Sequence, residues 1–407
     1  MRQAGFLVQS RQLPRQDRTS AIADLEKSLQ SSATSENSRS SFQILLDLAV
    51  ELMATRQQDA ISRAKSLIHQ AKELLEQDFT SSPAQDSLFQ QENLAYLLYV
   101  QAILSISTSE MNTALDQLQG AYNIYSDLNH AEGRSLIDDT LGQYHLQLYN
   151  SQLALSHLER SLSLRLDGED RAIALSYIHL GCLYLVTTEL AQSASLFNSA
   201  LEIAIANADE YLRRQALKGL IKIAIAQREW ASAFAMLKDV IGLLKEPTDT
   251  IEIGYLYCDL AESLLGNDQV EESLICVRIQ VLPRFRDFQY SQGIAIAKHL
   301  RGRIYVQRLL VGLDALDEDA IETAEDSLID ASITFEQFGM MFEYAKSLYD
   351  LASLYQLCSN SQLQYQYQGK SLRSLELALS VLDKIGLSNS ELASKVDALL
   401  DQVMRKG

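Results

Sequence analysis

The residues best placed for chemistry are three cations that recur at intervals of four residues, Arg214, Lys218 and Lys222. In a helix this spacing puts all three side chains on one stripe. A basic stripe on a chain with a formal net charge of -18 would concentrate an acidic ligand. The alternative interpretation is that these are solvated side chains balancing nearby acids such as Asp209 and Glu229.

The sequence carries no motif typical of catalysis. It lacks G-x-S-x-G, P-loop, H-E-x-x-H and paired-cysteine patterns, so we expect a protein that is not an enzyme and uses no cofactor. His145 and His157 could meet, but without an evident third ligand they favour a structural pair over a metal site. The widely spaced cysteines indicate small apolar core residues of a reduced, cytoplasmic protein.

The charge balance and the apolar runs exclude several classes of partner. With 53 acidic and 35 basic residues, the chain lacks the concentrated basic surface that nucleic-acid binding requires. A role on anionic membrane surfaces is disfavoured for the same reason. No apolar run reaches the roughly 18 residues that a membrane-spanning helix needs, so we expect no membrane insertion.

These candidate residues must be positioned by a pattern that repeats, with variations, from about residue 42 to about residue 383. The clearest copy is Ser176–Ala204. Leu180-Gly181 and Tyr184 belong to a first helix, in which the small glycine allows a second helix to cross closely. Ser193, Phe197 and Ala200 follow the i, i+4, i+7 spacing of one stripe on that second helix.

This unit resembles the tetratricopeptide repeat, whose signature is Leu-Gly and Tyr in the first helix and Ala, Phe and Ala in the second. The resemblance implies an all-α protein, a right-handed α-solenoid of about eight helical hairpins with a C-terminal capping helix. Stripes of successive repeats end at Ser161, Ala200, Val240 and Gln280, which gives a period of about 40 residues. Repeats of this length are similar to the sensor-type regions of bacterial signalling proteins.

Three positions depart from the repeat pattern. Ile221 stands where a glycine is expected, and its bulk should splay that helix pair. Gln280 ends the sixth stripe, where an apolar residue is expected. In a third place His145 replaces the usual tyrosine, which brings it opposite His157.

The pattern divides the chain into three parts. Residues 1–40 are expected to be a flexible N-terminal segment with a short helix at 21–30. Four arginines among the first 20 residues superficially resemble a targeting signal, and a frayed basic terminus is the alternative. Residues 41–387 form the repeat array, and residues 388–407 a capping helix. Ser388 and Glu391 fit a capping box at its start, with Ser390 as an alternative cap.

The resemblance also implies how the protein binds. In the family, Lys218 and Lys222, and by alignment His299 and Arg303, fall at first-helix positions that face a concave groove. With Arg214 they form the predicted partner-binding groove. Tyr177, Tyr255 and Tyr349 are candidates for its lining, and packing in the core is the alternative role for these tyrosines. We expect an interaction scaffold that holds a protein or peptide segment, with acidic segments favoured. The alternative is a sensory receptor that binds a short peptide and signals to a separate output protein.

Overall fold

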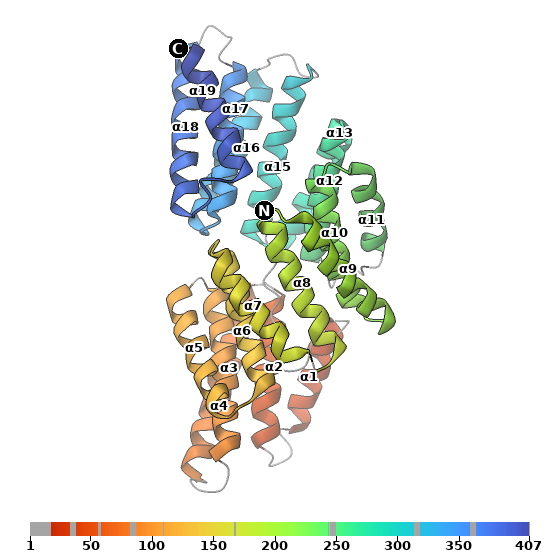
Figure 1. Ribbon diagram of the computed structural model, residues 1–407, viewed down its shortest axis with the longest axis vertical. Helices are drawn as coiled ribbons and strands as arrows, with labels where there is room; N and C mark the ends of the chain where they lie inside the picture. The colour runs from red at the N-terminus through yellow and green to blue at the C-terminus, as the bar shows by residue number, and fades with distance from the viewer. Residues whose placement is uncertain are drawn as a thin grey trace. The chain divides into compact units, whose positions relative to one another are not determined.

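The computed structural model describes residues 18–32, 38–55, 58–81, 87–108, 110–166, 168–242, 244, 250–312, 318–358 and 364–406. Every regular element in these ranges is a helix (Figure 1). The predicted all-α class is therefore confirmed. The chain forms two compact units, an N-terminal unit of residues 3–223 and a C-terminal unit of residues 224–407, and each is described by itself.

The N-terminal unit is built from consecutive helices that pair as hairpins, each consisting of a first and a second helix. α2 packs against α3, α4 against α5, α6 against α7, and α8 against α9. α10, predicted from the sequence as the first helix of a fifth pair, lies mostly in this unit. The helices are α1 (Arg18–Ser32), α2 (Ser38–Ala54), α3 (Gln58–Ser81), α4 (Ser87–Ser107), α5 (Met111–Asp127), α6 (Ala131–Gln147), α7 (Ser151–Arg165), α8 (Asp170–Val186), α9 (Leu190–Ala206) and α10 (Glu210–Ala226).

Helix α1 is longer than the short helix expected at residues 21–30, and it packs against the first pair. It contacts α2, and Glu26 pairs with Arg63 of α3 at 2.7 Å. Ala21 is fully buried, and Leu25 packs against the core of this unit. The described part of the N-terminal segment thus contributes to the folded N-terminal unit.

The C-terminal unit continues the same alternation. Its helices are α11 (Trp230–Gly242), α12 (Thr250–Gly266), α13 (Val270–Cys276), a π-helical turn η1 (Val277–Val281), α14 (Leu282–Asp287), α15 (Ser291–Leu310), α16 (Glu318–Gln337), α17 (Met341–Cys358), α18 (Gln364–Lys384) and α19 (Glu391–Lys406). α12 packs against α13 and η1, α15 against α16, and α17 against α18, while α19 covers α18. The order of helices along the chain matches the predicted pairs.

The predicted second-helix stripes are buried. Ser193, Phe197 and Ala200 have no exposed surface, and the stripes of the other pairs are buried as well, with one exception in the sixth pair. A serine suits the stripe because its hydroxyl has an acceptor nearby: Ser193 Oγ donates to the carbonyl oxygen of Gly181 at 2.7 Å. Ser273 donates to Ala261 in the same way at 2.6 Å. The buried hydroxyl is thereby satisfied.

The predicted close crossing at glycine is also observed. A methyl group at Gly302 would lie 2.6 Å from Leu328 Cγ, and one at Gly142 would lie 2.5 Å from Leu158 Cγ. At Gly181 the contact is with the ring of Phe197, at 3.0 Å. Any larger residue at these crossings would push the paired helices apart.

Gln280 is the exception among the stripe residues, and the structure gives the reason. The turn η1 contains one more residue than an α-helical turn would, so Val281 takes the buried stripe position and Gln280 moves to a partly exposed one. Pro283 follows Leu282 and lacks the N–H that an α-helix would donate to the carbonyl oxygen of Ile279. The carbonyl oxygen of Gln280 accepts a hydrogen bond from Arg284 Nη1 at 2.7 Å.

The capping residue of α19 is Ser390. Its hydroxyl oxygen accepts a hydrogen bond from the backbone N–H of Ala393 at 3.2 Å. Ser388 instead donates to Asp383 at 2.8 Å, so the predicted Ser388–Glu391 capping box is wrong and the alternative is confirmed. The reason is the helix start at Glu391, which makes Ser390 the residue directly before the first turn.

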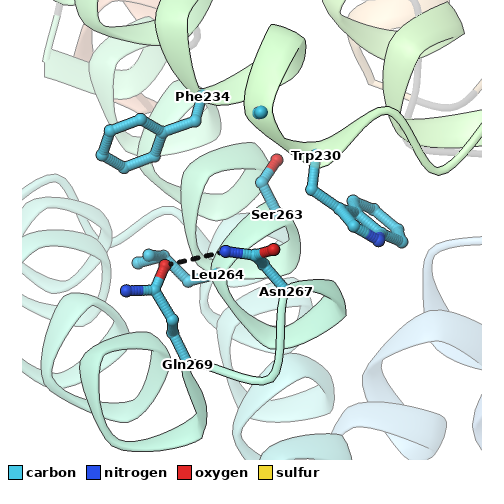
Figure 2. A pocket seen from close by; sticks show the side chains of 7 residues that line it. Trp230, Phe234, Ser263, Leu264, Asn267 and Gln269 are labelled. Carbon is cyan, nitrogen blue, oxygen red and sulfur yellow. Dashed lines mark hydrogen bonds between the residues drawn. The ribbon is translucent and has the colours of Figure 1, made fainter.

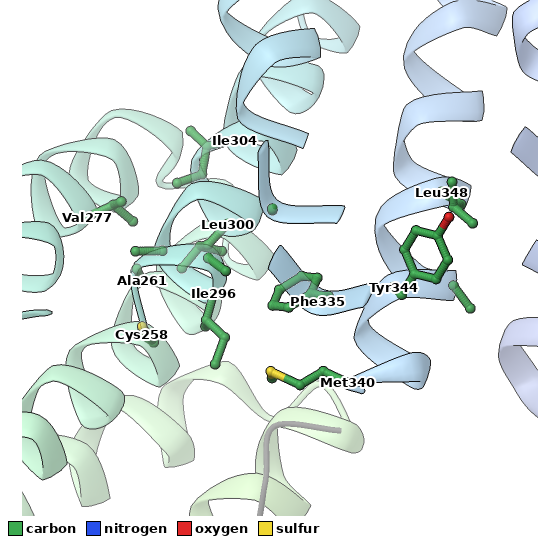
Figure 3. Packing of buried hydrophobic residues seen from close by; sticks show 14 of the residues in the cluster. Cys258, Ala261, Val277, Ile296, Leu300, Ile304, Phe335, Met340, Tyr344 and Leu348 are labelled. Atoms are coloured by element: carbon green, nitrogen blue, oxygen red, sulfur yellow. The ribbon is translucent and has the colours of Figure 1, made fainter. Parts of the chain in front are cut away.

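The core of the C-terminal unit forms along α15. Ile296, Leu300 and Ile304 recur every four residues and are buried (Figure 3). Figure 3 shows them between Ala261 of α12 on one side and Phe335 of α16 on the other. This apolar side fixes the rotation of α15 and so determines which of its polar residues face the neighbouring first helices.

Candidate functional site

The first helices of the C-terminal unit lie next to one another. α15 contacts α12 on one side and α17 on the other. Charged side chains bridge the three helices and form what we call the bridging cluster: Glu262 from α12, His299 and Arg303 from α15, and Lys346 and Asp350 from α17.

Arg303 is the centre of the bridging cluster. Its Nη1 lies 2.8 Å from Oε1 of Glu262, and its Nε lies 3.8 Å from Oδ2 of Asp350. The Nζ of Lys346 lies 3.9 Å from the same oxygen of Glu262. The side chains of Glu262, Arg303 and Lys346 are 18%, 24% and 30% exposed, so a ligand can reach them.

His299 supports this cluster from the buried side. Its Nε2 lies 2.7 Å from Oδ2 of Asp350, and its ring makes a T-shaped contact with the ring of Phe335. Burial lowers the pKa of His299 to about 4, so the ring is neutral at pH 7 although it faces a carboxylate. Burial acts to raise the pKa of Asp350, but the hydrogen bond from His299 and the charge of Arg303 outweigh it and hold that pKa below its ordinary value.

The bridging cluster contains two residues that the sequence had placed in the groove and three that it had not. His299 and Arg303 are both present, although His299 is buried and carries no charge there. Glu262, Lys346 and Asp350 were missed. The sequence did contain one signal for Glu262. The small residue at the helix crossing, Ala261 in α12 and Gly302 in α15, is followed by Glu262 in one helix and by Arg303 in the other, so residues of opposite charge stand at equivalent positions.

The basic stripe lies on α10 in the N-terminal unit. Arg214 is buried, and its Nε has no hydrogen-bond partner among the described residues. Lys218 is partly buried and donates to Gln215 at 3.1 Å. Arg214, Lys218 and Lys222 thus belong to one unit and His299 and Arg303 to the other, so one groove holding all five stays a prediction.

The lysines of the stripe lie near a first-helix thiol. Burial raises the pKa of Cys182 to about 11, and the charges of Lys222 and Lys218 lower it only in part. Burial likewise raises the pKa of Cys276 to about 12. All four cysteines are free thiols within the described residues, and Cys258, Cys276 and Cys358 are buried as expected.

A second polar network occupies the interior of the N-terminal unit. Asp139 of α6 lies 2.7 Å from His179 Nδ1 of α8 and 3.5 Å from Arg165 of α7, and all three are almost fully buried. Burial acts to raise the pKa of Asp139, but these partners outweigh it and leave the pKa below its ordinary value. This network joins three helices, and because its side chains are buried it offers no surface to a ligand.

The predicted histidine pair forms on the neighbouring face. The rings of His145 and His157 stack with their centroids 5.4 Å apart. His157 Nδ1 lies 2.8 Å from Asp138, which also accepts from Arg160 at 2.7 Å. No group of three or more histidine, cysteine or acidic side chains within the described ranges is arranged to hold a metal ion.

A shallow pocket lies between α11 and the end of α12 (Figure 2). Trp230 and Phe234 form one wall, and Asn267, which donates to Gln269 at 3.3 Å, lies opposite. The indole of Trp230 packs over Gly266, where a methyl group would lie 2.5 Å from the ring. The volume of the pocket is about 210 Å³, which is smaller than the roughly 300 Å³ of the smallest usual ligand pockets.

None of the helices in the described ranges is both long enough and apolar enough to cross a bilayer.

Comparison with known proteins identifies the fold of the chain. No family model matches the chain, and no curated protein matches it. Among solved structures, a Rap protein complexed with Competence and Sporulation Factor covers 90% of this chain and 98% of its own, with a TM-score of 0.58 and 14% identity. The Rap conjugation gene regulator of the plasmid pLS20, in complex with the Phr* peptide, covers 89% and 97%, with a TM-score of 0.56 and 10% identity.

Aspartyl phosphate phosphatase F from Bacillus subtilis is also similar, with a TM-score of 0.56, 11% identity, and coverage of 88% of this chain and 90% of its own. Identities this low establish the architecture alone. The predicted resemblance is confirmed at that level: the chain has the tetratricopeptide-like helical-repeat fold of these proteins.

Proposed function

We propose that this protein is a non-enzymatic regulatory receptor that binds a short peptide on the first helices of its repeats. The observation that carries the proposal is the bridging cluster, in which Glu262, Arg303 and Lys346 meet on a partly exposed face of three adjacent helices. Ion pairs that serve stability alone can be fully enclosed, as between Asp139 and His179. Partly exposed charges on prepositioned helices are suited to polar recognition of a peptide.

The solved structures support this choice of partner. One similar protein was solved with Competence and Sporulation Factor and another with the Phr* peptide. The scaffold that we expected from the sequence, holding a longer segment of a protein, would use the same face and remains the second candidate. In either case the bound partner acts as a regulator by its differential affinity for two forms of the repeat array.

We propose that Arg303 contacts the peptide directly. His299 acts indirectly, because it binds Asp350, which lies next to Arg303. Arg214, Lys218 and Lys222 are proposed as a separate contact region of the N-terminal unit for an acidic partner segment. One similar protein is named a phosphatase. We propose no catalysis here, because the charges of the bridging cluster are paired with one another and the pKa values of Cys182 and Cys276 keep both thiols protonated at pH 7. A cytoplasmic location is proposed with this function.

The test is an affinity selection of short peptides from a pooled synthetic library by the full chain. Arg303→Met should reduce recovery at least about tenfold if Arg303 contacts the peptide. Arg301→Met is the matched control, because Arg301 lies on the same helix, is also partly buried and donates to Ser327 of the second helix at 3.0 Å. Equal recovery by both variants, or no selected peptide at all, would overturn the proposal.

A further inference from the structure

We propose that Glu262 occupies the position of a ligand carboxylate, and that a carboxylate of the bound peptide displaces it from Arg303 and Lys346. This inference rests on the proposed function and names the chemical group that the site recognises. The carboxylate can come from an acidic side chain or from the C-terminus of the peptide.

The geometry around Glu262 is that of an anion held by two cations. Its Oε1 lies 2.8 Å from Arg303 Nη1 on α15 and 3.9 Å from Lys346 Nζ on α17. Glu262 itself comes from a third helix, α12. Cations from two different repeats therefore converge on one oxygen of a side chain that belongs to neither, as they would on a ligand. Guanidinium and ammonium groups together favour a carboxylate at that place.

The exchange is feasible because these side chains are not enclosed. Each of the three is about one-fifth to one-third exposed, so Glu262 can rotate into water when a ligand arrives. Partly exposed ion pairs contribute little net stability, which makes one carboxylate readily replaceable by another. The Asp139–His179 pair is the contrast: at 1% and 3% exposure neither group can leave without an uncompensated buried charge.

The remaining members of the cluster hold the cations in place during the exchange. Asp350 lies 3.8 Å from Nε of Arg303, a different nitrogen from the one that Glu262 contacts. Asp350 is in turn held by His299 at 2.7 Å. When Glu262 leaves, two cations of the bridging cluster remain with one carboxylate, so the position that it vacates favours an anionic group over a cationic one.

Removing the charge of Glu262 should increase the affinity of the protein for peptides that carry a carboxylate. The probes are three synthetic peptides of equal length: acetyl-Gly-Ser-Glu-Ser-Gly-amide, its glutamine counterpart, and the glutamine peptide with a free C-terminal carboxylate. Binding to the methyl-labelled full chain is followed by NMR titration. Glu262→Gln should bind the carboxylate peptides about fivefold more tightly than the wild type does, which corresponds to about 1 kcal/mol.

Controls separate this account from a structural role of Glu262. Asp330→Asn releases Lys298, which it binds at 2.8 Å on the same α15, and should leave affinity unchanged. Arg303→Met should abolish the preference for carboxylate peptides. If Glu262→Gln folds poorly, Glu262→Asp, whose shorter side chain cannot span both cations, should show the same gain.

Weaker or unchanged carboxylate binding by both Glu262 variants would overturn the inference, as would equal binding of the glutamine amide and the carboxylate peptides. If the library selection still recovers peptides on the wild type and fewer on Arg303→Met, the proposed function stands without this inference. If the selection fails as well, both the inference and the proposed function are wrong. The better of the two carboxylate peptides identifies the source of the group.

Discussion

The packing of Phe197 leads to a quantitative prediction for Gly219→Ala. In the N-terminal unit a methyl group at Gly219 of α10 would lie 2.3 Å from Cε1 and Cζ of the Phe197 ring. The ring has little room to retreat, because it also packs closely against Gly181 of α8, where an added methyl group would lie 3.0 Å from its Cζ. Phe197 is fully buried between these two glycines.

Two opposing effects determine the size of the change. Alanine is favoured over glycine within a helix by up to about 1 kcal/mol. Overpacking a rigid core costs roughly 1–3 kcal/mol, and a contact this short on a ring confined from both sides belongs at the upper end. We therefore expect a net loss of about 2 kcal/mol in the stability of the N-terminal unit.

Hydrogen exchange in α8 and α9 is the appropriate assay, since a chain of two units need not unfold in one step. Gly120→Ala on α5 is the matched control: its methyl group would meet only Leu98 at 3.4 Å, so this variant should be neutral or slightly more stable. Combining Gly219→Ala with Phe197→Leu should cost less than the sum of the two single changes. Protection in Gly219→Ala equal to that in Gly120→Ala would refute the packing described here.

Three further predictions concern backbone strain, pH and helix register. Thr188 adopts a φ of 66° in the turn after α8, so Thr188→Gly should raise the melting temperature by relieving roughly 1 kcal/mol of strain, whereas Thr187→Gly should lower it. The His299 side chain binds a proton less readily in the folded protein, where its pKa is about 4, than in the unfolded chain, where its pKa is the ordinary 6.5. The free energy of unfolding should therefore rise with pH between about 4 and 6.5. His299→Asn should flatten this pH dependence, and an unchanged slope would contradict the assignment. Deleting Gln280 should convert η1 into a regular α-helical turn and leave the chain folded by circular dichroism, whereas deleting Asp239 from the regular helix α11 should misplace its stripe and disrupt the packing of α11 against α12.

Much of the fold could be predicted because its determinants are local. The spacing of Ser193, Phe197 and Ala200 and the small Gly181 are properties of one helical hairpin, and they determine how that hairpin packs. The pairing of His145 with His157 followed from the same register. The π-helical turn was signalled only by the misfit of Gln280, because the periodicity shows that a residue is out of place but not that the helix contains an extra one.

The candidate site was less accessible to sequence reasoning. Glu262, Arg303 and Asp350 belong to three repeats, so their contacts depend on how successive first helices are rotated and offset. The sequence favoured cations, since isolated stripes such as Lys218 and Lys222 stand out in an acidic chain. It did not indicate that Arg303 is compensated by acids from both neighbouring repeats.

Native mass spectrometry of the full chain purified from its own cells at low salt would test the central claim most directly, because it detects a bound molecule whatever its sequence, and the variants then show whether Arg303 holds it. The account predicts a short peptide on the wild type and on Arg301→Met that is absent from Arg303→Met. A peptide retained equally by Arg303→Met, or a wild-type protein that carries none, would contradict it.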